Sequence, residues 1–137
     1  MAAKSGRLCS IKLGTNLIQL MGTWSMPGVS TDLLESTAFG DDWKQFKTGL
    51  LDGGTITFNG LYDPADTTGQ DALRTANEDS TELTDVRLYI DSTSYWIPTT
   101  TGPASYMLVT DWEIGADKSA LMTASFSLKV SGKLELI

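Results

Sequence analysis

The amino-acid sequence predicts a mainly β protein, an antiparallel β-sandwich or barrel flanked by one short α-helix. Three observations support this fold class. Apolar and polar residues alternate along several segments with the period of two that half-buried strands require. A single segment with a helix-start pattern interrupts these strands, and clusters of glycine, proline and asparagine separate them. Strands on both sides of one helix are typical of a sandwich or barrel with that helix on its outside.

The first half of the chain contains four expected strands. Residues 8–13 and 18–26 are rich in apolar residues and are separated by a Gly14-Thr15-Asn16 turn, which predicts an N-terminal hairpin. Residues 29–37 are rich in β-branched and apolar residues, and residues 55–59 alternate between apolar and polar side chains. Both are expected to be strands, the second with one face in water.

Residues 68–77 are expected to form the helix. The turn at residues 63–66 precedes it, and Thr67 followed by Gln70 fits a capping box, in which each side chain satisfies an exposed backbone donor of the other residue. The apolar face of this helix is narrow and consists of Ala72, Leu73 and Ala76. Such a face suits a helix that lies against a sheet.

The second half of the chain carries three expected strands, residues 85–91, 106–114 and 122–130. Residues 122–130 have the clearest alternation of apolar and polar residues, and the alternation resumes in step in residues 134–136. We therefore expect one long terminal strand that is kinked at Gly132.

The length of 137 residues predicts one domain with a single core. We expect residues 8–137 to form this β-sandwich domain and residues 1–7 to be a flexible N-terminal segment. No apolar run approaches the ~20 residues of a membrane span, and the first residues lack the apolar stretch of a signal peptide. We therefore expect an intracellular protein that does not associate with a membrane.

A long connection, residues 38–54, separates the strands expected at 29–37 and 55–59. Connections longer than about 12 to 15 residues are usually functional or disordered, and disordered segments are poor in large apolar side chains. This connection contains both large apolar residues and acids: Phe39, Asp41, Asp42, Trp43, Phe46, Leu50 and Leu51. The spacing of Trp43, Phe46 and Leu50 would place them on one side of a short helical turn. The loop either caps its own barrel or reaches another chain.

The composition excludes the common catalytic routes. The chain has no histidine and one cysteine, Cys9, so it cannot form a Ser/His/Asp or Cys/His arrangement, an imidazole-ligated metal site or an internal disulfide. Asp111 and Glu113 share a strand face as paired catalytic carboxylates would, but a solvated face explains them better. The spacing of three acids near the helix differs from that of a calcium loop: Asp63, Asp66 and Asp71. We expect no enzyme activity, metal or cofactor.

The formal net charge of −7 is unevenly distributed along the chain. Residues 1–31 carry three basic side chains and no acid, whereas residues 32–91 carry 13 acids and four basic side chains. The chain lacks the cluster of lysines and arginines that a nucleic-acid-binding surface needs. The segregation of charge would instead favour head-to-tail docking of one copy on another.

Four segments follow a characteristic order of strands and turns. They are Leu33-Leu34-Glu35-Ser36-Thr37 before the acidic and aromatic loop, residues 49–58, Leu61-Tyr62-Asp63-Pro64 ahead of the short helix, and residues 125–133 near the end. In this order they resemble the major tail tube proteins of long-tailed, siphovirus-like bacteriophages. The resemblance extends over about residues 8 to 134.

This resemblance implies a structural virion protein with a β-sandwich and a flanking helix. Six copies would form a ring, and stacked rings would form the tail tube, a hollow conduit for genome delivery around a tape-measure protein. The other implied partners are tail terminator and tail-tip proteins, and DNA that passes without adhering. The protein would assemble in the host cytoplasm and reside in the phage tail of the virion.

Three surfaces would serve such an assembly. The loop with Trp43 and Phe46 would anchor the stacking of rings, because aromatic residues dominate interface energies. The strand near the end carries a single charge and is expected to add to a neighbour's sheet at its edge, along Ser125, Ser127 and Lys129. An acidic lumen would repel DNA. The candidate lumen acids alternate with apolar residues on strands: Asp85, Asp91, Asp111 and Glu113.

A monomeric carbohydrate-binding β-sandwich module is the alternative function. Its sugar-stacking platforms would be tryptophans: Trp24, Trp43, Trp96 or Trp112. The missing signal peptide and the helix inside the β pattern argue against it. A further alternative is a related ring with the same fold, such as a tail terminator or a secretion-system tube ring.

Overall fold

The computed structural model describes residues 5–100 and 104–137 of the chain. Residues 1–4 of the expected N-terminal segment lie outside the described residues. The strands are β1 (Ser10–Leu13), β2 (Asn16–Leu17), β3 (Met21–Ser25), β4 (Ser30–Glu35), β5 (Phe46–Asp52), β6 (Thr55–Leu61), β7 (Val86–Tyr89), β8 (Tyr95–Pro98), β9 (Tyr106–Gly115), β10 (Thr123–Ser131) and β11 (Leu134–Leu136). One α-helix, α1, spans Gln70–Asp79 in the described residues, and a 3-10 turn spans Gly6–Leu8.

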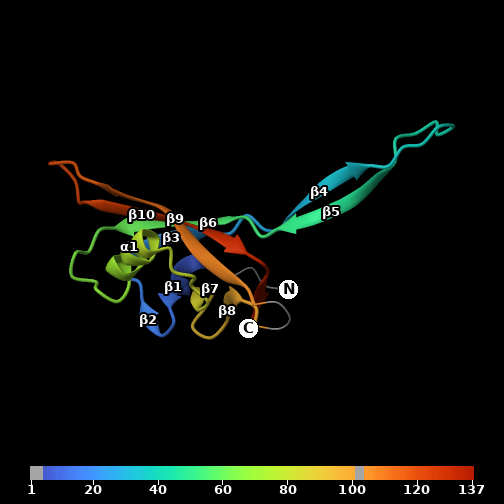
Figure 1. Ribbon diagram of the computed structural model, residues 1–137. Helices are drawn as coiled ribbons and strands as arrows, with labels where there is room; N and C mark the ends of the chain where they lie inside the picture. The colour runs from blue at the N-terminus through green and yellow to red at the C-terminus, as the bar shows by residue number, and fades with distance from the viewer. Residues whose placement is uncertain (1–4, 101–103) are drawn as a thin grey trace.

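Two antiparallel sheets form the body of the molecule. One sheet has the strand order β11-β8-β7-β1-β2, and the other has the order β3-β6-β10-β9. The strands β4 and β5 pair with each other alone and form a two-stranded arm that projects away from the body (Figure 1). The expected antiparallel β fold with one flanking helix is confirmed, and the arm extends from it.

Alternating side chains of the four-stranded sheet build much of the core. In β6, Ile56 and Phe58 are buried while their neighbours are exposed, and β10 alternates in the same way. The register places Phe58 opposite Phe126, and their rings stack with centroids 5.4 Å apart. Ile11 and Leu88 of the five-stranded sheet belong to the same core cluster. Full burial of each such side chain contributes about 1.5–3 kcal/mol to stability.

The helix α1 begins at Gln70, two residues later than expected, and an aspartate orients its first turn. The expected capping box of Thr67 and Gln70 is wrong, because the N-cap residue is a glycine with no side-chain bond. Instead, Asp66 Oδ2 accepts hydrogen bonds from Gln70 N at 3.1 Å and from Gln19 N at 2.9 Å. The buried Gln70 amide donates to the carbonyls of Gln19 and Leu61. Gln70 therefore ties the helix to the end of β6 and to the segment before β3.

Two segments expected to be single strands are divided between the sheets. The expected N-terminal hairpin is present, but its second strand is only the short β2 with Ile18 N bonded to Ile11 O, whereas residues 21–25 form β3 in the other sheet. The expected long terminal strand is likewise two strands in different sheets, separated at Gly132 with φ of +104°. A Cβ on Gly132 would collide with Ser105. Glycine is therefore needed where the chain crosses between sheets.

Part of the expected loop over residues 38–54 is a strand. Residues Phe46–Asp52 form β5 and pair with β4, so the connection between them is only residues 36–45. The helical turn expected for Trp43, Phe46 and Leu50 is wrong, because Phe46 and Leu50 lie in extended backbone.

Candidate interaction surfaces

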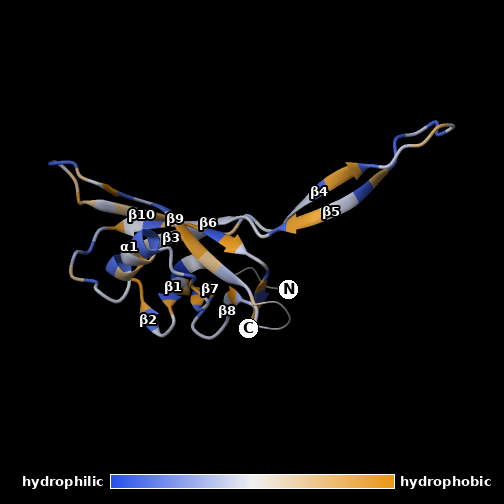
Figure 2. Ribbon diagram, viewed as in Figure 1, coloured by the Kyte–Doolittle hydropathy of each residue, from blue (hydrophilic) through white to orange (hydrophobic). Residues whose placement is uncertain are grey.

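The arm exposes large apolar side chains along its whole length. Figure 2 shows apolar positions on β4 and β5, clear of the body. The side chains that are more than half exposed here are Val29, Leu33, Leu34, Phe39, Trp43, Phe46, Leu50 and Leu51. A two-stranded hairpin is marginally stable alone in water, and a contiguous apolar patch of this kind marks an interaction surface.

Both faces of the arm are apolar. Neighbouring side chains on a strand point to opposite faces, so Leu33 and Leu34 lie on different faces, as do Leu50 and Leu51. The register between the two strands places Phe46 on the face of Leu33. Covering the arm therefore requires neighbours on both sides or a groove around it.

The end of the arm, residues 36–45, presents its side chains to solvent. The expected contact residues here are all exposed: Phe39, Asp41, Asp42 and Trp43. Trp43 is 82% exposed. Asp41 has a structural role as well, because its Oδ2 accepts a hydrogen bond from Ala38 N at 2.8 Å and so closes a turn.

Two glycines with positive φ form the root of the arm. Gly28 has φ of +84° and Gly54 has φ of +82°, and a Cβ on Gly54 would lie 2.9 Å from Pro27 Cγ. Asp52 accepts hydrogen bonds from Lys129 Nζ of β10 and from Gly54 N, and these bonds lower the pKa of the Asp52 carboxyl. The ion pair of Asp52 with Lys129 thus links the arm to the body.

The outer face of the four-stranded sheet carries short polar side chains. Those on β3, β6 and β10 are Thr23, Ser25, Thr55, Thr57, Asn59, Thr123, Ser125, Ser127 and Ser131. Thr23 Oγ1 donates to Asn59 Oδ1. The hydroxyl oxygens of Ser25 and Thr57 lie 2.8 Å apart. Cross-strand bonds therefore connect β3 with β6 on this polar face.

Two of the expected lumen acids lie on the same polar face. Asp111 is paired with Ser127, and Glu113 is paired with Ser125. The register of β9 against β10 shifts at Thr110, which inserts an extra residue into β9. This bulge reverses which alternate residues of β9 face the core. Apolar residues on both sides of the bulge therefore face the core, while both acids face outwards.

The other two expected lumen acids lie elsewhere. Asp85 precedes β7, and its Oδ1 accepts a hydrogen bond from Arg87 Nε at 2.9 Å, which raises the pKa of Arg87. Asp91 Oδ1 accepts bonds from Thr93 N and Ser94 N, each at 2.8 Å, and so closes a turn. Both acids therefore adjoin the five-stranded sheet, whereas Asp111 and Glu113 lie on the four-stranded sheet.

The sheet order also corrects the expected edge pairing of β10. This strand lies between β6 and β9, so both of its edges are already paired within the chain. Ser125, Ser127 and Lys129 lie on the outer face and have no free edge beside them. The outermost strands of the sheet are β3 and β9.

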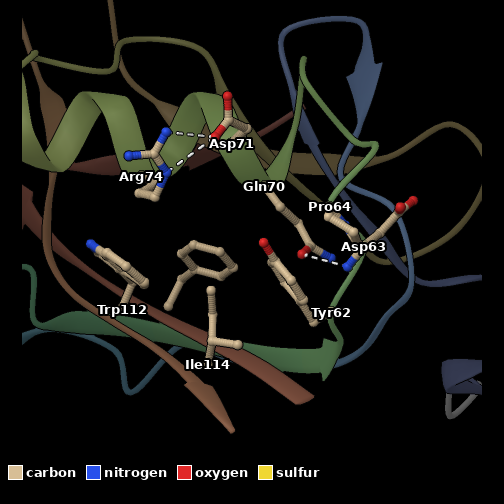
Figure 3. Close-up of a pocket in the computed structure, with 9 residues that line it drawn as sticks. Tyr62, Asp63, Pro64, Gln70, Asp71, Arg74, Trp112 and Ile114 are labelled. Carbon is tan, nitrogen blue, oxygen red and sulfur yellow. Dashed lines mark hydrogen bonds and ion pairs between the residues drawn. The ribbon is translucent and has the colours of Figure 1, made fainter. Parts of the chain in front are cut away.

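A small hollow lies between α1 and the sheet (Figure 3). Its lining includes Tyr62, Pro64, Trp112 and Ile114. Arg74 at its side is held by Asp71 Oδ1 at 2.8 Å and by Glu78 Oε1 at 2.9 Å. The volume of about 30 Å³ suits a water molecule and is far below the roughly 300 Å³ of the smallest ligand pockets.

The described tryptophans do not share a surface for sugar stacking. Three of them pack partly against the core: Trp24, Trp96 and Trp112. Trp43 stands apart at the end of the arm. In residues 5–100 and 104–137, no three metal-ligating side chains gather, and no helix is long and apolar enough to cross a membrane.

Sequence reasoning missed the root of the arm and its ion pair. Pro27-Gly28 and Gly53-Gly54 flank the segment that becomes the arm, and this pair of breaker motifs is the signal that identifies its two ends. Nothing in the sequence indicates that Asp52 and Lys129 meet, because they are 77 residues apart.

No protein-family model and no curated protein matches this chain. Among solved structures, this chain is similar to a chain from the tail of an empty gene transfer agent particle, which was refined helically with C6 symmetry. The TM-score is 0.76 and the sequence identity is 14%, and the match covers 98% of this chain and 99% of that chain. A chain from the anti-feeding prophage baseplate has a TM-score of 0.65 and 10% identity, covering 100% and 96%. A chain from the sheath/tube terminator of PVC, an extracellular contractile injection system, has a TM-score of 0.68 and 12% identity, covering 100% and 98%. The likeness establishes a shared fold over nearly the whole chain.

Proposed function

We propose that this chain is the subunit of a phage-like tail tube, a structural virion protein that assembles into stacked hexameric rings. The tube would be a conduit for genome delivery around a tape-measure protein, in a tail of the siphovirus type. The observation that carries this proposal is the arm, a two-stranded ribbon whose apolar side chains lie in water.

The arm supports assembly in the head-to-tail manner. The arm and the body of the next copy are different parts of the chain, so a contact between them is heterologous. Heterologous contacts either close into rings or propagate as helices. The edge of β3 and the part of the β9 edge beyond Val109 offer a second heterologous contact through strand pairing, since Leu83 already pairs with Met107 and Asn77 Nδ2 donates to Val109 O. One contact type would close a ring, and the other would stack the rings.

The polar face of the four-stranded sheet suits the inner wall of such a tube. Its hydroxyl and amide groups are uncharged, and Asp111 and Glu113 add negative charge. The lysine on this face, Lys129, is already paired with Asp52. Because non-specific DNA binding depends on basic side chains, DNA would pass along this wall without adhering.

The similar structures support the proposed symmetry and location. The gene transfer agent tail was refined with C6 symmetry, and the other two are parts of a baseplate and of a sheath/tube terminator. For this chain we infer a hexamer that assembles in the host cytoplasm and resides in a virion tail. Its partners would be itself, a tape-measure protein, and tail terminator and tail-tip proteins. This structural role needs no catalytic group, metal or cofactor.

Negative-stain microscopy and light scattering of the purified chain test this function. Rings or tubes that lengthen with concentration are expected. The double variant Trp43→Ala with Phe46→Ala should remain folded and stay unassembled, because it removes two exposed aromatic anchors. Leu17→Ala, at a half-exposed leucine of β2 outside the arm, is the control and should assemble normally. A wild-type chain that stays monomeric at high concentration would contradict the proposal.

A further inference from the structure

We propose that the end of the arm of one copy docks in a groove beside the N-terminal turn of a second copy. This inference rests on the self-assembly proposed above and names the surface that receives the arm. The groove lies next to the Gly6–Leu8 turn, beside the outermost strand β3 and the residue that follows β7.

Two adjoining hollows make up this groove. Their volumes are about 360 Å³ and about 250 Å³, and both are lined by Ser5 and Ile90. The remaining wall contains two large apolar side chains, Trp24 and Leu8, and Leu8 is 60% exposed. Each volume greatly exceeds the roughly 30 Å³ that one water occupies. Each hollow therefore has room for an aromatic side chain.

The end of the arm has the features that would fill the groove. Phe39 and Trp43 are two exposed aromatic side chains in the connection between β4 and β5. They match the two hollows in number, and their apolar rings match the apolar side chains of the groove wall. The arm end lies far from β1 and β3 of its own chain (Figure 1). A second copy is therefore the source of the docked arm.

Charge complementarity favours the same pairing. Asp42, next to Trp43, is exposed at the end of the arm. Arg7 lines the smaller hollow and forms no ion pair with another described residue. The acid in that hollow, Asp91, already accepts hydrogen bonds within its own turn. Docking would bring the Asp42 carboxylate towards the Arg7 guanidinium, and complementary rim charges fix the register of a contact.

The single cysteine of the chain provides a direct test. Cys9 lies in the groove wall and is partly exposed, so Lys44→Cys places a second thiol beside Trp43. Mild oxidation of assembled Lys44→Cys protein should give a ladder of disulfide-linked multimers on non-reducing gels. The ladder should disappear when Cys9→Ser is added.

Lys47→Cys is the matched control for this experiment. Position 47 lies on β5, roughly 10 Å further along the extended chain. We expect about tenfold more linked multimer from Lys44→Cys than from Lys47→Cys, because a disulfide requires Cα atoms within roughly 7 Å.

Charge exchange tests the same contact independently. Arg7→Glu and Asp42→Arg should each raise the critical concentration for assembly about two- to fivefold, the effect of losing one exposed ion pair. Their combination should return it towards the wild-type value.

The outcomes separate this docking from the proposed function. Tubes with equal linking at positions 44 and 47, or with none at either, would overturn the docking and leave the tube function intact. A chain that never assembles would overturn both. If Cys9 of the unassembled protein resists a small aromatic disulfide reagent, the groove is already filled within the subunit, and the docking is wrong.

Discussion

The body and the arm consist of the same kinds of strand but differ in what covers them. In β10 every second residue is buried, whereas in β4 every residue is exposed. Strand formation follows from local residue preferences, but stability follows from burial. Within one chain, the body has both the residue preferences that form strands and the burial that stabilises them. The arm has only strand pairing within its chain, and its large apolar side chains stay exposed there.

The largest expected effect is the loss of a ring from the core of the body. Phe58→Ala should lower the free energy of unfolding by about 3–5 kcal/mol, because Phe58 is 1% exposed and stacks on Phe126. Urea denaturation of the unassembled protein, followed by circular dichroism, measures this change. A loss of less than about 1 kcal/mol would contradict the close packing of Phe58 in the core.

Gly60 offers a second way to disturb the body without removing a side chain. A Cβ at this position would collide with Leu20 O and lie 2.6 Å from Met21 Cα, so Gly60→Ala should cost about 1–3 kcal/mol of unfolding free energy. Gly22→Ala is the control in the neighbouring strand, because a Cβ there meets nothing within 4 Å. Equal thermal unfolding of the two variants would contradict the close approach of β3 and β6.

An equivalent truncation in the arm should leave the single chain almost unaffected. Leu50 is 83% exposed, so Leu50→Ala should change the free energy of unfolding of the unassembled chain by less than about 0.5 kcal/mol. The critical concentration for assembly should rise about tenfold, as expected for losing one buried leucine at an interface. Light scattering across a dilution series measures this critical concentration. A large loss of stability in the unassembled chain would mean that the arm folds back on its own body.

The smallest expected effect concerns the ion pair at the root of the arm. The pKa of Asp52 is lower in the folded chain than in the unfolded chain, chiefly through its bond with Lys129. The pair therefore stabilises the root above the ordinary carboxyl pKa of 3.8, and this stabilisation is lost as the pH falls through the lower folded value.

Carboxyl titration by NMR measures this shift. Lys129→Gln should move the Asp52 midpoint upwards towards 3.8. The Asp117 carboxyl is an internal control, because its pKa is lowered by hydrogen bonds from Ser119 and should not move. An unchanged Asp52 midpoint would show that Lys129 does not hold the arm.

The sequence predicted those parts of the fold that depend on local patterns. Alternation in β6 and β10 indicated half-buried strands, since one face of each packs into the core. The strand β5 was missed for the opposite reason. Neither of its faces is buried by its own chain, so no polar and apolar alternation marks it as a strand.

Long-range placement could not be read from the same patterns. Alternation shows that a residue has a wet face, but not which sheet or surface that face belongs to. Asp111 and Glu113 therefore lie on the polar face of the four-stranded sheet, while Asp85 and Asp91 adjoin the other sheet. The chain crosses between the two sheets at Gly132, and the bulge at Thr110 changes which residues of β9 face the core. Both features depend on backbone geometry that the pattern of apolar and polar side chains does not reveal.

The short side chains on the polar face would set the width of any passage that this face lines. Serine, threonine and asparagine extend only a little way from the backbone, whereas lysine, arginine and glutamate reach much further. Lys129 and Glu113 are the long charged side chains on this face, and the Lys129 ammonium group is held at the arm root by Asp52. A ring with this face inward would therefore keep an opening close to the spacing of its backbones, narrowed chiefly by Glu113.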